Sequence, residues 1–118
     1  MPLKVLNRDG NSITYANPTD PNYQVRIKTT STKKALRGNP VDNYVTEIII
    51  NDDNAVQLPN VTGLVEDALS VRIRVSGTVY SQERIMAVIN NVLPLLPTWG
   101  SEGVFVGFEP TTPPEPLV

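Results

Sequence analysis

The chain contains no histidine and no cysteine. The missing imidazole excludes a Ser-His-Asp triad, and the missing thiol excludes Cys-His catalysis, thiolate zinc sites and disulfide bonds. Haem ligation through either side chain is excluded for the same reason. We therefore predict that the protein is not an enzyme, that it has no catalytic residues, and that it holds no metal or other cofactor.

Aromatic residues and long apolar runs are also scarce. Aromatic residues make up 6% of the chain and hydrophobic residues 40%, so the core must be aliphatic. No stretch approaches the roughly 18 consecutive apolar residues of a membrane span, and residues 1–4 open no signal-peptide segment. We expect a single domain over residues 1–118, made and used in the cytosol, with neither a membrane nor a small-molecule substrate as partner.

Two acidic pairs are the remaining candidates for chemistry. Asp52 and Asp53 lack the spaced oxygen donors and the downstream glutamate of a calcium-binding loop. Glu66 and Asp67 would have to act through carboxylate or metal chemistry alone, because the chain offers no imidazole and no thiol. Neither pair changes the prediction of a protein without catalytic or metal sites.

The charge is unevenly distributed, although the net charge is only −2. Residues 1–50 carry seven Lys or Arg side chains against four acids, whereas residues 51–118 carry three against eight. A basic half of this kind fits a polyanionic partner, and ordinary solubilising charge is the alternative.

Turn residues predict two connections in the first half of the chain. Asp9 and Gly10 form a pair typical of a tight turn, so we expect a β-hairpin within residues 1–16. Residues 31–41 are polar and contain a Gly-Asn-Pro run, which predicts an exposed loop between two strands.

Alternating side chains predict the main sheet. Apolar and polar residues alternate over residues 23–30 and again over residues 70–78, and the segment 44–51 is rich in β-branched residues. These strands place the main sheet over residues 23–80. One of its faces is expected to be apolar and the other polar.

A single amphipathic helix is predicted over residues 81–96. Ser81 suits the N-cap, and Glu83 puts a negative charge in the first turn. Pro94 and Pro97 end the regular helix. The apolar stripe that would face the core or a dimer partner includes Ile85, Ile89, Val92 and Leu93.

The remainder of the chain is predicted to be an extended tail over residues 97–118. It contains a short β-like segment at 103–108 and a proline-rich end. The fold class is therefore α+β: an antiparallel β-sheet with an N-terminal hairpin and one C-terminal amphipathic helix.

The predicted sheet has more apolar area than its helix can cover. A helix of about a dozen residues is roughly 18 Å long at about 1.5 Å per residue, which is too short to shield one face of such a sheet. A second copy of the chain would supply the missing cover, so we expect a two-fold homodimer. The alternative is a monomer in which residues 104–108 fold over the sheet.

Four cations alternate with apolar residues on two of the predicted strands: Arg26, Lys28, Arg72 and Arg74. The planar fork of arginine binds phosphate oxygens in pairs, and a basic sheet face neutralises a nucleic-acid backbone without reading its bases. The alternative is weak surface pairing with Glu47 and with solvent.

The order of the elements adds a family resemblance. The Asp9-Gly10 turn, the Asn43-Tyr44 pair and the Thr-x-Tyr-Ser sequence at residues 78–81 follow one another along a short chain without an enzyme site. In this order, and best over residues 23–93, the chain resembles the coat protein of a single-stranded RNA bacteriophage of the levivirus group.

The resemblance implies an intertwined dimer, in which two sheets join edge to edge and each helix packs over the partner's sheet. Such dimers assemble in the bacterial host cytoplasm into the icosahedral shell of the virion, with the loop at residues 52–69 making the contacts around symmetry axes. The sheet face opposite the helices would line the interior and bind single-stranded genomic RNA. The resemblance places on that face Arg26, Lys28, Asn43, Glu47, Ser70, Arg72 and Arg74.

The chain departs from the family pattern at the operator-binding positions. Arg26 and Lys28 stand where small hydroxyl residues form an adenine pocket, and Ser70 stands where a tyrosine stacks on a base. Aromatic stacking, worth about 1–3 kcal/mol per base, is thus missing at that position. We predict a capsid subunit that packages RNA through its phosphates. The alternative function is a dimeric RNA-binding regulator, a translational repressor, that does not assemble.

Overall fold

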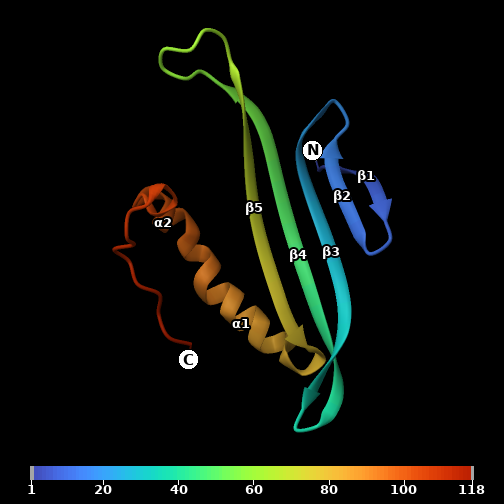
Figure 1. Cartoon of the computed structure of the whole chain (residues 1–118). Helices are drawn as coiled ribbons and strands as arrows, with labels where there is room; N and C mark the ends of the chain where they lie inside the picture. Colours follow the sequence, from blue (N-terminus) through green and yellow to red (C-terminus); the bar gives the residue numbers. More distant parts are fainter. Residues whose placement is uncertain (1, 118) are drawn as a thin grey trace. The chain divides into compact units, whose positions relative to one another are not determined.

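The computed structural model describes residues 2–117, in which a five-stranded sheet precedes a helical segment (Figure 1). Each strand lies beside its neighbours in sequence, so the sheet is an antiparallel meander. This confirms the predicted class of an antiparallel sheet with an N-terminal hairpin and a C-terminal helix. The strands are β1 (Lys4–Asp9), β2 (Ser12–Asn17), β3 (Asp20–Leu36), β4 (Asn39–Val56) and β5 (Val65–Thr78).

The helical segment begins directly after β5 and is less regular than predicted. Instead of one helix over residues 81–96, it consists of a 3₁₀ turn at Val79–Ser81, α1 (Gln82–Val92), a second 3₁₀ turn at Leu93–Leu95 and α2 (Leu96–Ser101). Pro94 and Pro97 are the second residues of the last two elements, within the first turn, where a backbone nitrogen has no partner inside the element and a proline is tolerated. The regular helix α1 ends at Val92, as the prolines predicted, and the chain continues past it in two shorter helical elements.

The rest of the predicted tail also differs from expectation. The β-like segment at residues 103–108 is wrong, because Val104–Val106 forms a 3₁₀ turn. Gly103 and Gly107 flank this turn with φ of 83° and 100°, a left-handed conformation that ends a helical turn and that glycine adopts without strain. By contacts the chain divides into two units, Met1–Ser76 and Gly77–Val118.

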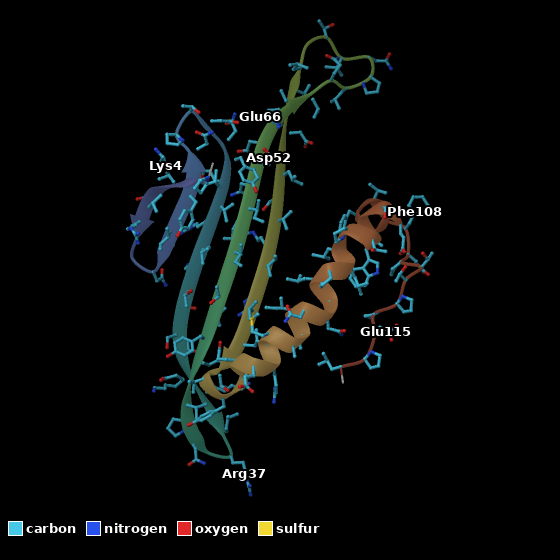
Figure 2. All side chains as sticks on the ribbon, turned by 180° about the vertical axis from the view of Figure 1, so that it is seen from behind. Lys4, Arg37, Asp52, Glu66, Phe108 and Glu115 are labelled. Atoms are coloured by element: carbon cyan, nitrogen blue, oxygen red, sulfur yellow. The ribbon has the colours of Figure 1, made fainter. Side chains whose placement is uncertain are left out.

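The predicted exposed loop at residues 31–41 is wrong as well. β3 and β4 pair through this region and are joined by a two-residue turn at Arg37 and Gly38, with φ of 50° and 81°. Positive φ at both central positions is the conformation that joins twisted strands most tightly. Arg37 therefore lies at the tip of a long hairpin (Figure 2).

The polar composition that suggested a loop has a structural reason. β2 pairs with β3 only as far as Lys28 and β5 reaches β4 near Asn43, so the ends of β3 and β4 beyond these points form a two-stranded ribbon (Figure 1). Both faces of such a ribbon meet water, and polar residues are then expected on both. Within the ribbon, Lys33 and Asp42 form an ion pair across the strands.

The loop predicted at residues 52–69 is shorter than expected. Residues 52–56 belong to β4 and residues 65–69 to β5, which leaves residues 57–64 as the connection. The Gln57 Nε2 atom donates to the backbone oxygens of Leu58 at 3.1 Å and Val61 at 2.7 Å. The connection is thus held by its own side-chain hydrogen bonds.

The sheet has two chemically different faces, and the register decides which residue lies on which. Residues directly opposite one another in an antiparallel pair share a face. Val25 pairs with Tyr15 and Ile50, and Ile27 pairs with Ile13 and Ile48, so these side chains lie together on an apolar face. They are not fully covered: the one buried hydrophobic residue among those described is Ala16.

The C-terminal tail is held by hydrogen bonds within the second unit. The indole Nε1 of Trp99 donates to the Thr112 oxygen at 2.7 Å, and Asn91 Nδ2 donates to the Glu115 oxygen at 2.8 Å. Glu102 accepts from the Thr111 N–H at 2.8 Å and from the Thr112 hydroxyl. The tail therefore runs back along the helical segment (Figure 2).

Acid is expected to release this tail. The hydrogen bond from the Thr112 hydroxyl, followed by that from the Thr111 N–H, lowers the pKa of Glu102 below its ordinary value. The ionised carboxylate therefore stabilises the folded tail at neutral pH, and this contribution is lost as the pH falls through the lowered pKa. Trp99 is the only tryptophan in the chain, so its fluorescence reports the change directly.

We expect a Trp99 fluorescence transition in the acid range that Glu102→Gln removes, since the amide carries no titrating charge. Glu109→Gln is the matched control, because Glu109 makes none of these bonds, and it should leave the transition in place. An acid transition that survives in Glu102→Gln would show that another group controls the tail.

Asn43 is expected to stabilise the packing of β4 against β5. It is 9% exposed, and its Nδ2 atom donates to the Ser76 hydroxyl of β5 at 3.4 Å. Asn43→Ala should lower the free energy of unfolding by about 1–2 kcal/mol, because a buried hydrogen bond is lost. Urea denaturation at fixed protein concentration measures this. Combining the change with Ser76→Ala should cost less than the two single losses added together.

Candidate nucleic-acid interface

Two basic residues of β3, Arg26 and Lys28, lie on the polar face of the sheet. Arg26 lies opposite Thr14 and Ile49, and Lys28 lies opposite Ser12 and Glu47, so their side chains point away from the apolar face. The two cations are two residues apart on one strand, a spacing of about 6.8 Å. They form a short basic row on the open surface of the sheet.

β5 adds its arginines to the same face. The Asn43–Ser76 hydrogen bond shows that Ser76 shares the face of Asn43, which the register places with Arg26 and Lys28. Side chains alternate along a strand, so Arg74, Arg72 and Ser70 follow Ser76 on this face. Burial along β5 agrees with this alternation, because Ile73 and Val75 are half-buried while Arg72 and Arg74 are exposed.

All seven residues predicted for the RNA side thus lie on one face, which we call the basic face. They are Arg26, Lys28, Asn43, Glu47, Ser70, Arg72 and Arg74. Their environments differ, because Asn43 is buried against Ser76 and its amide is already engaged. The exposed cations Arg26, Arg72 and Arg74 are the better candidates for contact with a ligand.

The cations of the basic face are not neutralised by nearby carboxylates. Within residues 2–117, the ion pair found is Lys33 with Asp42, in the outer ribbon. The hydrogen bond from Lys33 to Asp42, and then the attraction of the two charges, raise the pKa of Lys33 above its ordinary value. Lys28 lies opposite Glu47 without reaching ion-pair distance, so the alternative of pairing with Glu47 is not realised.

The two acidic pairs of the sequence are not arranged for joint chemistry. Asp52 and Asp53 are consecutive residues of β4, and Glu66 and Asp67 are consecutive residues of β5. Consecutive side chains of a strand point to opposite faces, so neither pair can place two carboxylates on one site. In the described part of the chain, no cluster of three or more acidic residues is placed to hold a metal ion.

The helix residues predicted for the dimer or core lie on one side of the helical segment. Ile85, Ile89 and Val92 belong to α1, and Leu93 begins the next turn; all four are half-buried. Met86 and Val88 are exposed, so α1 presents more apolar surface than the predicted stripe alone. None of the helices in residues 2–117 has the length and apolar character needed to span a membrane.

The loop at residues 57–64 forms a second candidate contact surface. Leu58 is 42% exposed, Val61 is 41% exposed and Leu64 is 69% exposed. Asn60 and Gly63 adopt left-handed conformations with φ of 62° and 82°, which turn the chain back on itself. An apolar loop at the end of the sheet is typical of a protein–protein contact.

The polar residues of β1 and β2 are the part of the basic face that the sequence did not indicate. The register brings Asn7, Thr14 and Arg26 into one row across three strands, and Asp9, Ser12 and Lys28 into the next. The alternation of polar and apolar residues in β2 predicts that the strand has a polar face. The residues of the hairpin do not determine which strand β2 pairs with or in which register.

Of three comparisons with known proteins, the one with solved structures found similar chains. No protein-family model matches the chain, and no curated protein sequence matches it. Among solved structures, a chain of the virus-like particle of bacteriophage PQ-465 superposes with a TM-score of 0.83 and 22% identity, over 98% of this chain and 95% of that one. A chain of the virus-like particle of bacteriophage ESE001 gives a TM-score of 0.61 and 11% identity, over 98% and 97%.

Both similarities cover nearly the whole of the described chain, including the sheet, the helical segment and the tail. The resemblance stated from the Asp9-Gly10 turn, the Asn43-Tyr44 pair and the Thr-x-Tyr-Ser junction is therefore confirmed at the level of the fold. This chain has the fold of a bacteriophage coat protein.

Proposed function

We propose that the chain is a structural capsid subunit that dimerises, assembles into an icosahedral shell, and binds single-stranded RNA on its basic face. The observation that carries the proposal is the two-sided sheet: one face is apolar and incompletely covered, and the other holds Arg26, Lys28, Arg72 and Arg74 without ion-pair partners among the described residues. The fold shared with chains of two phage virus-like particles supports the same function.

Dimerisation is supported by the edge strand and by the exposed apolar side chains. β5 is the last strand of the sheet and is 14 residues long, so one row of its backbone groups faces no strand of the same chain. Long open edges are templates for pairing with another chain. A two-fold contact between two β5 strands would continue the sheet, and the same contact would cover Val71, which is 44% exposed.

Assembly beyond the dimer is supported by the connection at residues 57–64. Its apolar residues are exposed, its backbone is held by the Gln57 amide, and it lies at the end of β4 and β5 (Figure 1). A shell needs a contact of this kind that is separate from the dimer surface. This role was predicted for residues 52–69, and we propose it for the shorter connection.

RNA binding is supported by the charge of the basic face. Unpaired cations on an open β-surface bind phosphates and release counterions, which gives affinity without sequence preference. In the capsid, the basic face would line the interior. We place the protein in the virion and its assembly in the host cytoplasm.

Expression of the full chain in bacteria tests the proposal. We expect closed particles in negative-stain micrographs, and nuclease-protected RNA inside them. Small soluble dimers that bind RNA but form no particles would instead support the regulator that does not assemble. Particles without RNA would remove the proposed role of the basic face.

Removing the β5 arginines is expected to reduce the packaged RNA. Arg72→Ala combined with Arg74→Ala should lower the RNA content per particle and flatten the salt dependence of RNA binding, by roughly 0.7–0.9 in the log–log slope for each lost phosphate contact. The matched control is Arg8→Ala with Arg84→Ala, which removes the same charge. Arg8 lies on the opposite face, since it pairs with Ile13, and Arg84 lies on α1.

The RNA content is read from the ratio of absorbance at nucleic-acid and protein wavelengths, and the dimer is checked by sedimentation. Equal loss of RNA in the control would mean that total charge, rather than the basic face, controls packaging.

A charge on the apolar stripe of α1 is expected to prevent dimer accumulation. Ile89 is half-buried on that stripe, and an unpaired carboxylate placed there would cost several kcal/mol when a partner covers it. Ile89→Asp should therefore abolish dimers in sedimentation equilibrium. Ala87→Asp is the control, because Ala87 is exposed on the other side of the helix. A normal dimer from Ile89→Asp would mean that another surface of α1 faces the partner.

A further inference from the structure

A polar pocket opens on the basic face, away from the arginines of β5. Its volume is about 270 Å³, and it lies across β1, β2, β3 and the far half of β4. The proposed packaging through phosphates makes no use of it. The side chains that line it are Asn7, Asp9, Ser12, Thr14, Gln24, Arg26 and Asn51.

The pocket arises from the sizes of the side chains on neighbouring strands. β2 presents only small residues to this face, and two of them are buried, Ser12 at 3% exposure and Ala16 at 0%. Longer side chains rise on both sides, Asn7 from β1 and Gln24 from β3. The small residues of β2 therefore form the floor, and the neighbouring strands form the walls.

Arg26 is positioned by the floor of the pocket. Its Nη2 atom donates to the Ser12 hydroxyl at 3.4 Å, and that hydroxyl donates in turn to the Asp9 backbone oxygen at 3.0 Å. The guanidinium is thus directed along the pocket and keeps its remaining N–H donors for a ligand. This arrangement differs from that of the β5 arginines, which are on open strand surface without such a support.

The pocket is lined by one carboxylate, that of Asp9, and one guanidinium, that of Arg26. A ligand must therefore offer hydrogen-bond donors to Asp9 and acceptors to Arg26. A phosphate group would meet the negative charge of Asp9, so the pocket does not suit a second backbone contact. A ligand that offers adjacent donors on one edge and adjacent acceptors on another would satisfy both charged groups. The size is below the roughly 300–1,000 Å³ of pockets for drug-sized ligands, which fits a single nucleobase.

Guanine is the base with that pattern. Its O6 and N7 atoms are adjacent acceptors and form the commonest bidentate contact with arginine. Its N1–H and N2–H groups are adjacent donors, which a carboxylate accepts in the same paired manner. Bases of single-stranded RNA are unstacked and can be read on both edges.

We propose that this pocket binds a guanine base of single-stranded RNA, with Arg26 on O6 and N7 and Asp9 on N1–H and N2–H. This assignment rests on the proposed RNA binding and adds a base preference to it. The amides of Asn7 and Asn51, which also line the pocket, supply further donors and acceptors around the ring. In this proposal Arg26 binds the base, and the β5 arginines bind the phosphates of the RNA backbone.

Fluorescence anisotropy with short RNAs tests the assignment on the full-length protein after its co-purified nucleic acid has been removed at high salt. The probes are an oligouridine and the same oligouridine with one central guanosine, adenosine or inosine. We expect the guanosine probe to bind at least about fivefold more tightly than oligouridine, the lower end of what one bidentate base contact provides. Inosine, which lacks the N2 amino group, should lose part of this gain.

Asp9→Asn is the decisive variant, because it keeps the size of the side chain and removes the paired acceptor. It should abolish the difference between guanosine and inosine. Asp52→Asn is the matched control: it removes the same charge from the opposite face, where Asp52 pairs with Tyr23, and it should keep the difference. Circular dichroism verifies that both variants fold.

The outcomes separate the two proposals. If no probe binds, RNA binding itself is wrong. If all probes bind equally, or if adenosine binds more tightly than guanosine, RNA binding stands and the guanine assignment is overturned. Retention of the difference between guanosine and inosine in Asp9→Asn would also overturn the assignment.

Discussion

The β3–β4 ladder runs without a bulge from the pair of Tyr23 and Asp52 to the pair of Leu36 and Asn39, and its register determines both faces of the sheet. A slip of one residue would move every side chain of one strand to the other face. Arg26 and Lys28 would then lie on the side of Ile48 and Ile50, and Val25 would lie on the side of Glu47. The basic face, the apolar face and the pocket of β2 all depend on this one alignment.

The two faces place opposite demands on the chain. The apolar face is stabilised only when another surface covers it, and among the described residues none of its hydrophobic side chains is fully buried, since Ala16, the buried one, lies on the basic face. The basic face gathers four cations without ion-pair partners among the described residues, and these repel one another until anions bind. A protein built in this way is suited to be one part of a larger assembly, with protein partners on one face and a polyanion on the other.

Much of the fold could be predicted from local patterns, and each error has its own physical reason. The strands over residues 23–30 and 70–78 were recognised because their side chains alternate. Residues 31–41 were expected to be a loop because they are polar, but a two-stranded ribbon is solvated on both faces and carries polar residues too. Pro94 and Pro97 were expected to end the regular helix, and α1 does end at Val92, but each proline then lies in the first turn of a new helical element that was not expected.

The amino-acid sequence by itself determined that the core is aliphatic, that thiol and imidazole chemistry are absent, and that Arg26, Lys28, Arg72 and Arg74 alternate with apolar residues. Such alternation depends only on the period of a strand. The tertiary structure alone decided that these four cations share a face, and that Asn7, Asp9 and Ser12 join Arg26 around one pocket. The physical reason is that pairing between strands is set by long-range register, which no local pattern contains.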